Sequence, residues 1–274
     1  MVEIRPATAD DYDAYVGLFG ELGIPDPVPT RERFTVAQVP VMRVATDGGA
    51  IVGYVTWRPY GSLAHVVQLA VDRARRGQRI GEQLLEHVRG EARGAGCERW
   101  YLNVKRGNEP AIKLYERVGL RYELAAHVMK LAWDRVPGAA GVGALPGLAG
   151  LAGLADPPED AAIAARFALP VERLATFRAR GSFRLVVVRE GESVGLGNDI
   201  VGFAAFDPAF PGAAVFCADR PERAPELLDA MRAWADPRFD FVRVTVEGNA
   251  PLAEAVLAMG AELTFEILRL SSPL

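Results

Sequence analysis

The residues best suited to chemistry form a turn at positions 71–81, VDRARRGQRIG. An apolar run that predicts a strand precedes the turn, and an apolar pattern of helical period follows it. Backbone N–H groups at the start of a helix have no intrahelical acceptor and lie at the positive end of its dipole. Gly77 and Gly81 let the backbone approach a ligand closely, and the arginines add positive charge. The turn therefore predicts a pyrophosphate site; the alternative is a solvated arginine-rich turn that only caps the helix.

A mixed α/β sheet is expected to position this turn. Thr8 and the acids after it predict the start of a first helix. The apolar spacing after the turn predicts a second helix, and a third is predicted from Asn108 to a stop at Gly119. The expected strands are 2–4, 41–45, 51–57, 66–71, 100–104 and 123–131.

The third predicted helix carries a second motif, residues 108–120 (NEPAIKLYERVGL). The succession of strand, turn, helix and strand, followed by Asn-x-x-Ala-x-x-Leu-Tyr-x-x-x-Gly, resembles the GNAT family of N-acetyltransferases over roughly residues 2–131. The segment Arg76-Gly-Gln-Arg-Ile-Gly81 is similar to that family's acetyl-CoA loop, Arg/Gln-x-x-Gly-x-Gly/Ala. Arg79 departs from it by standing at the middle glycine. Its long side chain, pointing to solvent or onto a phosphate, would be tolerated if the φ angle of Arg79 stays negative.

The resemblance implies that acetyl-CoA is the co-substrate. Its pantetheine arm would lie between two parallel strands that splay apart, here 66–71 and 100–104, and would pair with exposed backbone as an extra strand. Asn108 would contact the cofactor or cap the following helix, and both roles are compatible. The implied cofactor-binding residues are Leu69, Ala70, Val71, Arg76, Gly77, Gln78, Arg79, Ile80, Gly81 and Asn108.

Tyr115 is the candidate general acid. When an amine attacks the thioester, coenzyme A leaves as a thiolate, and a positioned phenol can protonate it. The alternative is a core tyrosine at helical spacing with its apolar neighbours.

The general base is less clear. An alkyl amine with a pKa near ~10.4 is mostly protonated at neutral pH, so a proton acceptor helps. Enzymes similar to this one often place a glutamate where Gln68 stands, and glutamine cannot take the proton. His65 should point to the opposite face by the period of two, so it would need a bulge to serve. Other options are an acceptor amine of low pKa or an acid on the first helix and loop: Asp10, Asp11, Glu21 or Asp26.

The second half of the chain repeats the first in outline. Residues 106–110 (RGNEP) match residues 247–251 (EGNAP), and each match has a glycine eleven residues after its asparagine. A duplicated fold explains this. The second phosphate turn, near residues 217–222, offers a proline and two acids, and Val256 stands at the tyrosine position. We therefore expect a degenerate GNAT-like domain that shapes the acceptor cleft of the first.

These features predict two acyl-CoA N-acyltransferase (GNAT-like) domains in tandem, residues 1–133 and 159–274. A Gly/Ala/Pro-rich linker is predicted between them at 134–158. Its uncharged part raises the possibility of a membrane span, but its glycines and prolines favour a linker.

Composition narrows the class of protein. The chain has 31 basic and 35 acidic residues and a net charge of −4, which argues against a nucleic-acid partner. Two cysteines and three histidines show no metal-ligand spacing, so no metal is expected. The N-terminus has no signal-peptide pattern, and the few cysteines favour the reducing cytoplasm.

The leading hypothesis is a cytoplasmic N-acetyltransferase, monomer or homodimer, that moves an acetyl group from acetyl-CoA to a primary amine of a small molecule or peptide. Transfer would be direct within a ternary complex, because Cys97 has no histidine partner to make it a nucleophile. One alternative is a non-catalytic acetyl-CoA sensor or scaffold, favoured by Gln68. Another makes the C-terminal half a partner-docking module.

Overall fold

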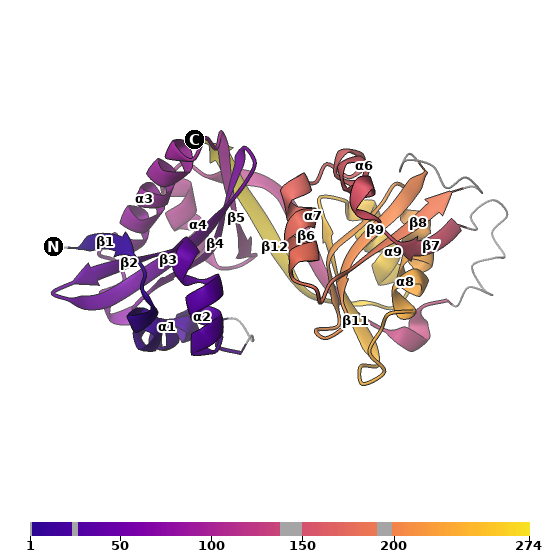
Figure 1. Cartoon of the computed structure of the whole chain (residues 1–274), viewed down its shortest axis with the longest axis horizontal. Coiled ribbons are helices and arrows are strands. Elements are labelled where there is room, and N and C mark those ends of the chain that lie inside the picture. The colour runs from indigo at the N-terminus through magenta and orange to yellow at the C-terminus, as the bar shows by residue number, and fades with distance from the viewer. Residues whose placement is uncertain (1, 24–26, 138–149, 191–198) are drawn as a thin grey trace. The chain divides into compact units, whose positions relative to one another are not determined.

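The computed structural model describes residues 2–23, 27–137, 150–190 and 199–274. The chain divides into two compact units (Figure 1). The first unit contains residues 1–123 together with 269–274, and the second contains residues 124–268. The end of the chain therefore belongs to the unit that contains its beginning.

The first unit is a sheet covered by helices on both faces. Its strands follow the order β1-β2-β3-β4-β5-β12. On one face Tyr15, Phe34 and Tyr54 share a core with helices α1 and α2. On the other face a Cβ at Gly53 would meet Ile80 and Leu84 of α3. The elements are β1 (Glu3–Pro6), α1 (Tyr12–Phe19), α2 (Arg31–Ala37), β2 (Met42–Asp47), β3 (Ala50–Tyr60), β4 (Leu63–Val71), α3 (Ile80–Gly94), β5 (Arg99–Lys105) and α4 (Glu109–Arg117).

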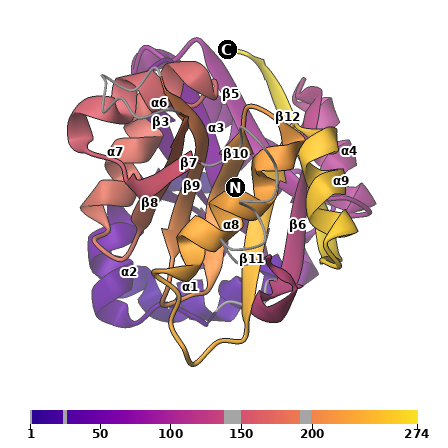
Figure 2. The same cartoon turned by 90° about the vertical axis from the view of Figure 1, so that its right-hand side faces the viewer.

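The second unit has the same plan. Its strands follow the order β12-β6-β11-β10-β9-β8-β7. Helices α6 and α7 pack on one face of the sheet and α8 and α9 on the other (Figure 2). The elements are β6 (Arg121–Ala132), β7 (Gly150–Leu154), α6 (Asp160–Arg166), α7 (Val171–Ala179), β8 (Arg184–Glu190), β9 (Ile200–Asp207), β10 (Gly212–Ala218), α8 (Ala224–Arg232), β11 (Phe241–Glu247), α9 (Ala250–Ala258) and β12 (Glu262–Pro273).

The last strands differ from the expected arrangement. We expected residues 123–131 to complete the first sheet, but β6 pairs antiparallel with β11, from Phe241↔Ala132 to Glu247↔Ala126. In its place the C-terminal residues join β5, where Trp100 Nε1 donates to Ser272 Oγ at 2.7 Å. The amide of Leu274 also donates to the Glu98 carbonyl. The apolar pattern of a strand predicts that it pairs with a neighbouring strand, but it does not specify which strand that neighbour is.

The predicted linker at 134–158 also differs in part. Residues 138–149 lie outside the described residues. Residues Gly150–Leu154 form β7, which pairs antiparallel with β8 as β1 pairs with β2. The second copy therefore begins inside the Gly/Ala/Pro-rich stretch. Among the described residues, no helix has both the length and the apolar character needed to cross a membrane.

Backbone contacts confirm the duplicated fold. After β4, the amide of Asp72 donates to the Val52 carbonyl at 3.0 Å, and after β10 that of Asp219 donates to the Val201 carbonyl at 2.9 Å. Helix α3 begins at Ile80 and helix α8 at Ala224. The turn of the second copy is therefore three residues shorter than that of the first.

Candidate active site

The parallel strands β4 and β5 part from one another. Their ladder runs from Leu63↔Arg99 to Val66↔Leu102 and then ends. Residues Leu69, Ala70 and Val71 remain paired with β3 on the other side. The edge of these three residues that faces β5 therefore has no strand partner among the described residues. Unpaired backbone at a strand edge can bind an extended ligand.

A β-bulge lies where the strands part. The β3–β4 register passes from Thr56↔Gln68 to Trp57↔Val66, so Val67 is an extra residue. Gln68 and His65 oppose Thr56 and Arg58, and residues two apart on β3 share a face. Our expectation that His65 points away from Gln68 is therefore wrong, because the bulge restores it to the same face.

His65 is fixed by stacking. Its ring lies 4.4 Å from that of Tyr101, with an interplanar angle of 5°. The guanidinium of Arg269 lies 4.7 Å from the same tyrosine ring. The C-terminal segment thus supports the aromatic neighbour of a candidate proton acceptor.

The turn before α3 presents free amides. The Asp72 side chain accepts from the amide of Ala74 at 2.9 Å and so caps a short 3₁₀ turn. Gly77 follows with a φ angle of +80°, which glycine adopts without strain. Among the described residues, no acceptor is recorded for the amides of residues 77–82. These donors lie at the N-terminus of α3, so the turn suits an anion.

Gly81 also lies at a close contact between helices. A Cβ at this position would lie 2.9 Å from Cδ2 of Leu114 on α4. Its glycine therefore favours the close packing of α3 against α4, in addition to the predicted approach of a ligand.

Arg79 does not have the negative φ angle that would make its side chain easily tolerated. It has a φ angle of +60° and a ψ angle of +16°, in the left-handed region, immediately before α3. The turn therefore keeps the backbone of the family's glycine although the residue is arginine. This conformation costs a residue with a Cβ about 1–2 kcal/mol.

The charge of the turn is partly neutralised. Arg75 pairs with Asp47 at 2.9 Å, and Arg76 pairs with Glu21. Arg79 is exposed, and no described acid pairs with it. Arg73 is likewise exposed without a described acid partner, so Arg73 and Arg79 are the arginines of the turn available to a phosphate.

Asn108 caps α4. Its Oδ1 accepts from the amide of Ala111 at 3.4 Å, and Asn249 accepts from Leu252 in the same way at 3.1 Å. The second copy keeps the cap without the arginine-rich turn, so the capping role does not depend on that turn.

Tyr115 lies on α4 and is 9% exposed. Burial raises the pKa of its phenol to about 12. A raised pKa keeps the hydroxyl protonated at neutral pH, so it remains a proton donor.

Two of the four acidic candidates for the base, Asp11 and Glu21, are engaged elsewhere. Asp11 accepts two 2.8 Å hydrogen bonds from Arg5, and this contact with the guanidinium lowers the pKa of its carboxyl. A lowered pKa makes Asp11 a poor base at neutral pH. Glu21 is paired with Arg76, Asp10 is exposed, and Asp26 lies outside the described residues.

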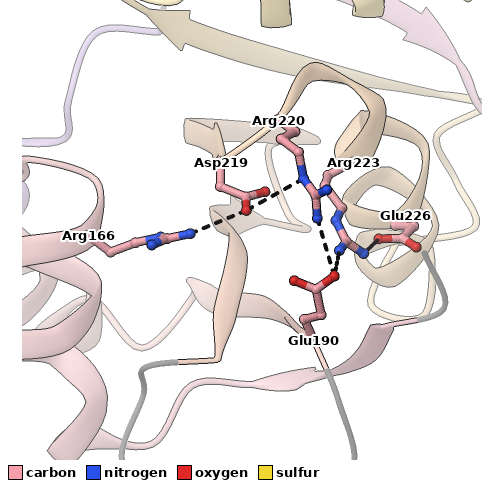
Figure 3. A network of polar contacts seen from close by, with 6 residues as sticks. All are labelled: Arg166, Glu190, Asp219, Arg220, Arg223 and Glu226. Atoms are coloured by element: carbon pink, nitrogen blue, oxygen red, sulfur yellow. Dashed lines mark hydrogen bonds and ion pairs between the residues drawn. The ribbon is translucent and has the colours of Figure 1, made fainter. Parts of the chain in front are cut away.

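The corresponding turn of the second unit is filled by its own side chains (Figure 3). Arg223, which precedes α8, is fully buried and donates to Glu190 at 2.7 Å and to Glu226 at 2.9 Å. An internal carboxylate thus lies in the first turn of α8, where an anion would otherwise bind.

The opening between the parallel strands of the second unit is also occupied. The β10–β11 ladder ends after Ala213↔Val244, and a bulge follows at Ala214. There Arg173 donates to the Ala214 carbonyl at 3.4 Å and forms two hydrogen bonds with Glu247. These contacts add a physical reason for the expectation that the second copy does not bind acetyl-CoA.

Neither cysteine suits covalent catalysis. Burial raises the pKa of both thiols, that of Cys217 to about 12, so neither is a ready thiolate. Within the described ranges, no group of three or more possible metal ligands is present.

Comparison with known proteins defines the class. Residues 12–120 match the model of the acetyltransferase (GNAT) family. An acetyltransferase from Pyrococcus horikoshii is 17% identical, with a TM-score of 0.71 over 100% of this chain and 89% of that one. A GCN5-related N-acetyltransferase from Sphaerobacter thermophilus is 15% identical, with a TM-score of 0.65 over 99% and 95%.

The tandem arrangement also has a structural relative. A tandem GNAT protein from the clavulanic acid biosynthesis pathway is 19% identical and has a TM-score of 0.63, covering 100% of this chain and 98% of that one. At such identity the likeness shows the fold. The chain therefore has the mixed α/β fold of tandem GNAT proteins.

Proposed function

We propose that the chain is an N-acetyltransferase that moves the acetyl group of acetyl-CoA to a primary amine of a small molecule or peptide. The match of residues 12–120 to the GNAT family model supports an acyltransferase in general. One observation carries the finer proposal. In the first unit a β4 edge without a strand partner leads into a turn in which the amides of residues 77–82 have no described acceptor.

Acetyl-CoA fits these two features in order. Its pantetheine amides would pair with the backbone of Leu69, Ala70 and Val71 as an added strand. The protein backbone then turns within a few residues, and the pyrophosphate of the cofactor would meet the amides of residues 77–81, which have no described acceptor. Arg79 would add a charged contact, while Asn108 would act through the α4 N-terminus that it caps.

The chemistry is direct transfer in a ternary complex. The amine nitrogen bonds to the thioester carbonyl carbon, and the carbon–sulfur bond breaks. The departing thiolate takes a proton from the Tyr115 hydroxyl, which its raised pKa keeps in the protonated form. No enzyme thiol takes part, because burial keeps Cys97 in the thiol form.

His65 is our candidate for the proton acceptor. The bulge at Val67 brings it to the face of Gln68, which holds the position of the family's frequent glutamate. An imidazole changes its charge between about pH 5 and 8, which suits proton transfer near neutral pH. A weakly basic amine would need no such group, and Gln68 would then only orient it.

We further propose that the active protein is a cytoplasmic monomer or homodimer that uses no metal, nucleic acid or membrane. Only the first unit would be catalytic, with bounds near residues 1–133. The second unit of the chain, with bounds near residues 159–274, would be a degenerate copy of the first.

The test is release of free thiol from acetyl-CoA in the presence of a panel of amines. Turnover is expected with at least one amine, and Tyr115→Phe should lower kcat about 10²–10⁴-fold with little change in acetyl-CoA affinity. Tyr122→Phe, on an exposed tyrosine, is the matched control and should leave both unchanged. Unchanged kcat in Tyr115→Phe would remove this residue from the mechanism.

A non-catalytic acetyl-CoA sensor or scaffold is the second candidate. The observation that favours it is Gln68, which cannot accept a proton at the frequent position of the base. A sensor would bind acetyl-CoA but release no thiol with any amine.

A further inference from the structure

The strands at the candidate active site carry an unusual set of charges. Strands β3, β4 and β5 contain no aspartate or glutamate, and their cations are Arg58, Arg99 and Lys105. Arg99 pairs with Glu123, and Lys105 donates to the Gly23 carbonyl. The acids of α1 and its flanks are paired or exposed. They are Asp10, Asp11, Asp13 and Glu21.

Arg58 differs from the other half-buried arginines of the first unit. It donates to the Ala37 carbonyl at 2.8 Å, which holds its side chain against α2. Among the described residues, no carboxylate forms an ion pair or hydrogen bond with Arg58. Arg43, also half-buried, pairs with Glu91 at 2.7 Å. Because a guanidinium removed from water is normally paired, Arg58 is suited to an anion that arrives with a ligand.

Two polar atoms beside Arg58 lack partners. Thr56 Oγ1 and Gln68 Oε1 are buried and form no hydrogen bond within the described part of the chain. Thr56 is 1% exposed, and the two residues oppose one another across β3 and β4. A buried polar atom without a partner is costly, so such atoms commonly contact water or a ligand.

All of these groups share one face of the sheet. Arg58 opposes His65, and Thr56, two residues earlier, opposes Gln68 at the bulge. Diagonal neighbours across two strands lie about 7–8 Å apart. A molecule can therefore reach Arg58 with one end and the bulge with the other.

We infer that the acetyl acceptor is a small amine that also carries an anionic group, a carboxylate or a phosphate, several bonds from its nitrogen. This inference rests on the proposed function. Arg58 binds the anion, the amine lies at the bulge beside Gln68 and His65, and Thr56 bonds to the polar atoms between them. Polyamines are poor acceptors, because these strands hold no carboxylate to bind their additional charges.

The experiment compares matched amines with the full-length protein by thiol release. One series pairs ω-amino carboxylates with the amides of the same acids, a second pairs amino-alkyl phosphates with amino alcohols, and a third contains polyamines. The anionic member of each pair is expected to have the higher kcat/KM by about 10- to 100-fold, the usual value of a charge-assisted hydrogen bond. The two anionic series separate carboxylate from phosphate.

Three variants locate the preference. Arg58→Gln should remove it by raising KM for anionic amines only, while Arg58→Lys keeps the charge and should keep part of it. A merely structural role would affect all amines alike in both variants. Arg93→Gln removes an exposed positive charge from α3, on the other face of the sheet, and should change nothing.

The outcomes are distinct. Equal turnover of neutral and anionic amines, or a preference that survives Arg58→Gln, would overturn the inference and leave the acetyltransferase standing. If no amine in the panel releases thiol, the proposed function fails and the inference with it.

Discussion

Replacement of Arg79 by glycine should stabilise the protein. Arg79 holds a φ angle of +60° just before α3. Such a conformation costs a residue with a Cβ about 1–2 kcal/mol. Glycine removes this strain but gives the unfolded chain more freedom, which costs about 0.5–1 kcal/mol. The net expectation is an increase of about 0.5–1 kcal/mol in the free energy of unfolding.

Urea unfolding followed by circular dichroism measures this difference, since the midpoint rises while the m-value stays constant. Gln78→Gly is the control: Gln78, the residue before Arg79, is exposed and has no positive φ, so glycine there should only destabilise. Arg79→Ala removes the charge but keeps the strain, and should leave stability close to that of the parent. If Arg79→Gly destabilised the protein as much as Gln78→Gly, the left-handed conformation would be refuted.

Three further predictions concern the first unit. Gly81→Ala should be less favourable than Gly90→Ala, because its new Cβ would lie 2.9 Å from Cδ2 of Leu114 and that side chain would have to shift, whereas Gly90→Ala, with open space around it in the same helix, should stabilise the unit by about 0.5–1 kcal/mol. Asp11→Asn should cost on the order of 1 kcal/mol at pH 7. Since Arg5 lowers the Asp11 pKa, that cost should persist above about pH 4 and disappear as the pH falls through the folded-state value. Deletion of residues 269–274 should unfold the first unit, because it removes the strand beside β5.

Urea midpoints for each variant, and for Asp11→Asn at several pH values, test these expectations. Equal effects of alanine at Gly81 and Gly90 would contradict the packing of α3 against α4. A cost at Asp11 that grew toward low pH would contradict the Arg5 contact. A folded chain without residues 269–274 would show that β5 needs no such neighbour. A truncation after residue 158 also removes residues 269–274. It should therefore unfold the first unit, so a loss of acceptor binding could not be assigned to the missing second unit alone.

The elements and the order of the motifs could be predicted from the sequence. Helical periodicity gives α3 and α4, and the strand–turn–helix order gives the amide-lined turn. Local patterns carry this information because each element must bury one apolar face. The duplicated fold was predicted from the matching segments at residues 106–110 and 247–251.

Four features could not be predicted in this way. The bulge at Val67 has no local signal, since valine suits a regular strand equally well. The left-handed Arg79 is imposed by the turn around it against its own preference. The exchange of β6 and β12 depends on which edges meet in three dimensions. Arg58 was missed for the same reason, because only the folded chain shows that it has no acid beside it.

The central claim is that the first unit holds an open site for a pyrophosphate and the second unit has filled its own. Isothermal titration of the full-length protein with coenzyme A tests both parts at once. One molecule should bind per chain, and Glu226→Gln, in the filled turn, should leave that single site unchanged. Binding of two molecules per chain, or of none, would contradict the account.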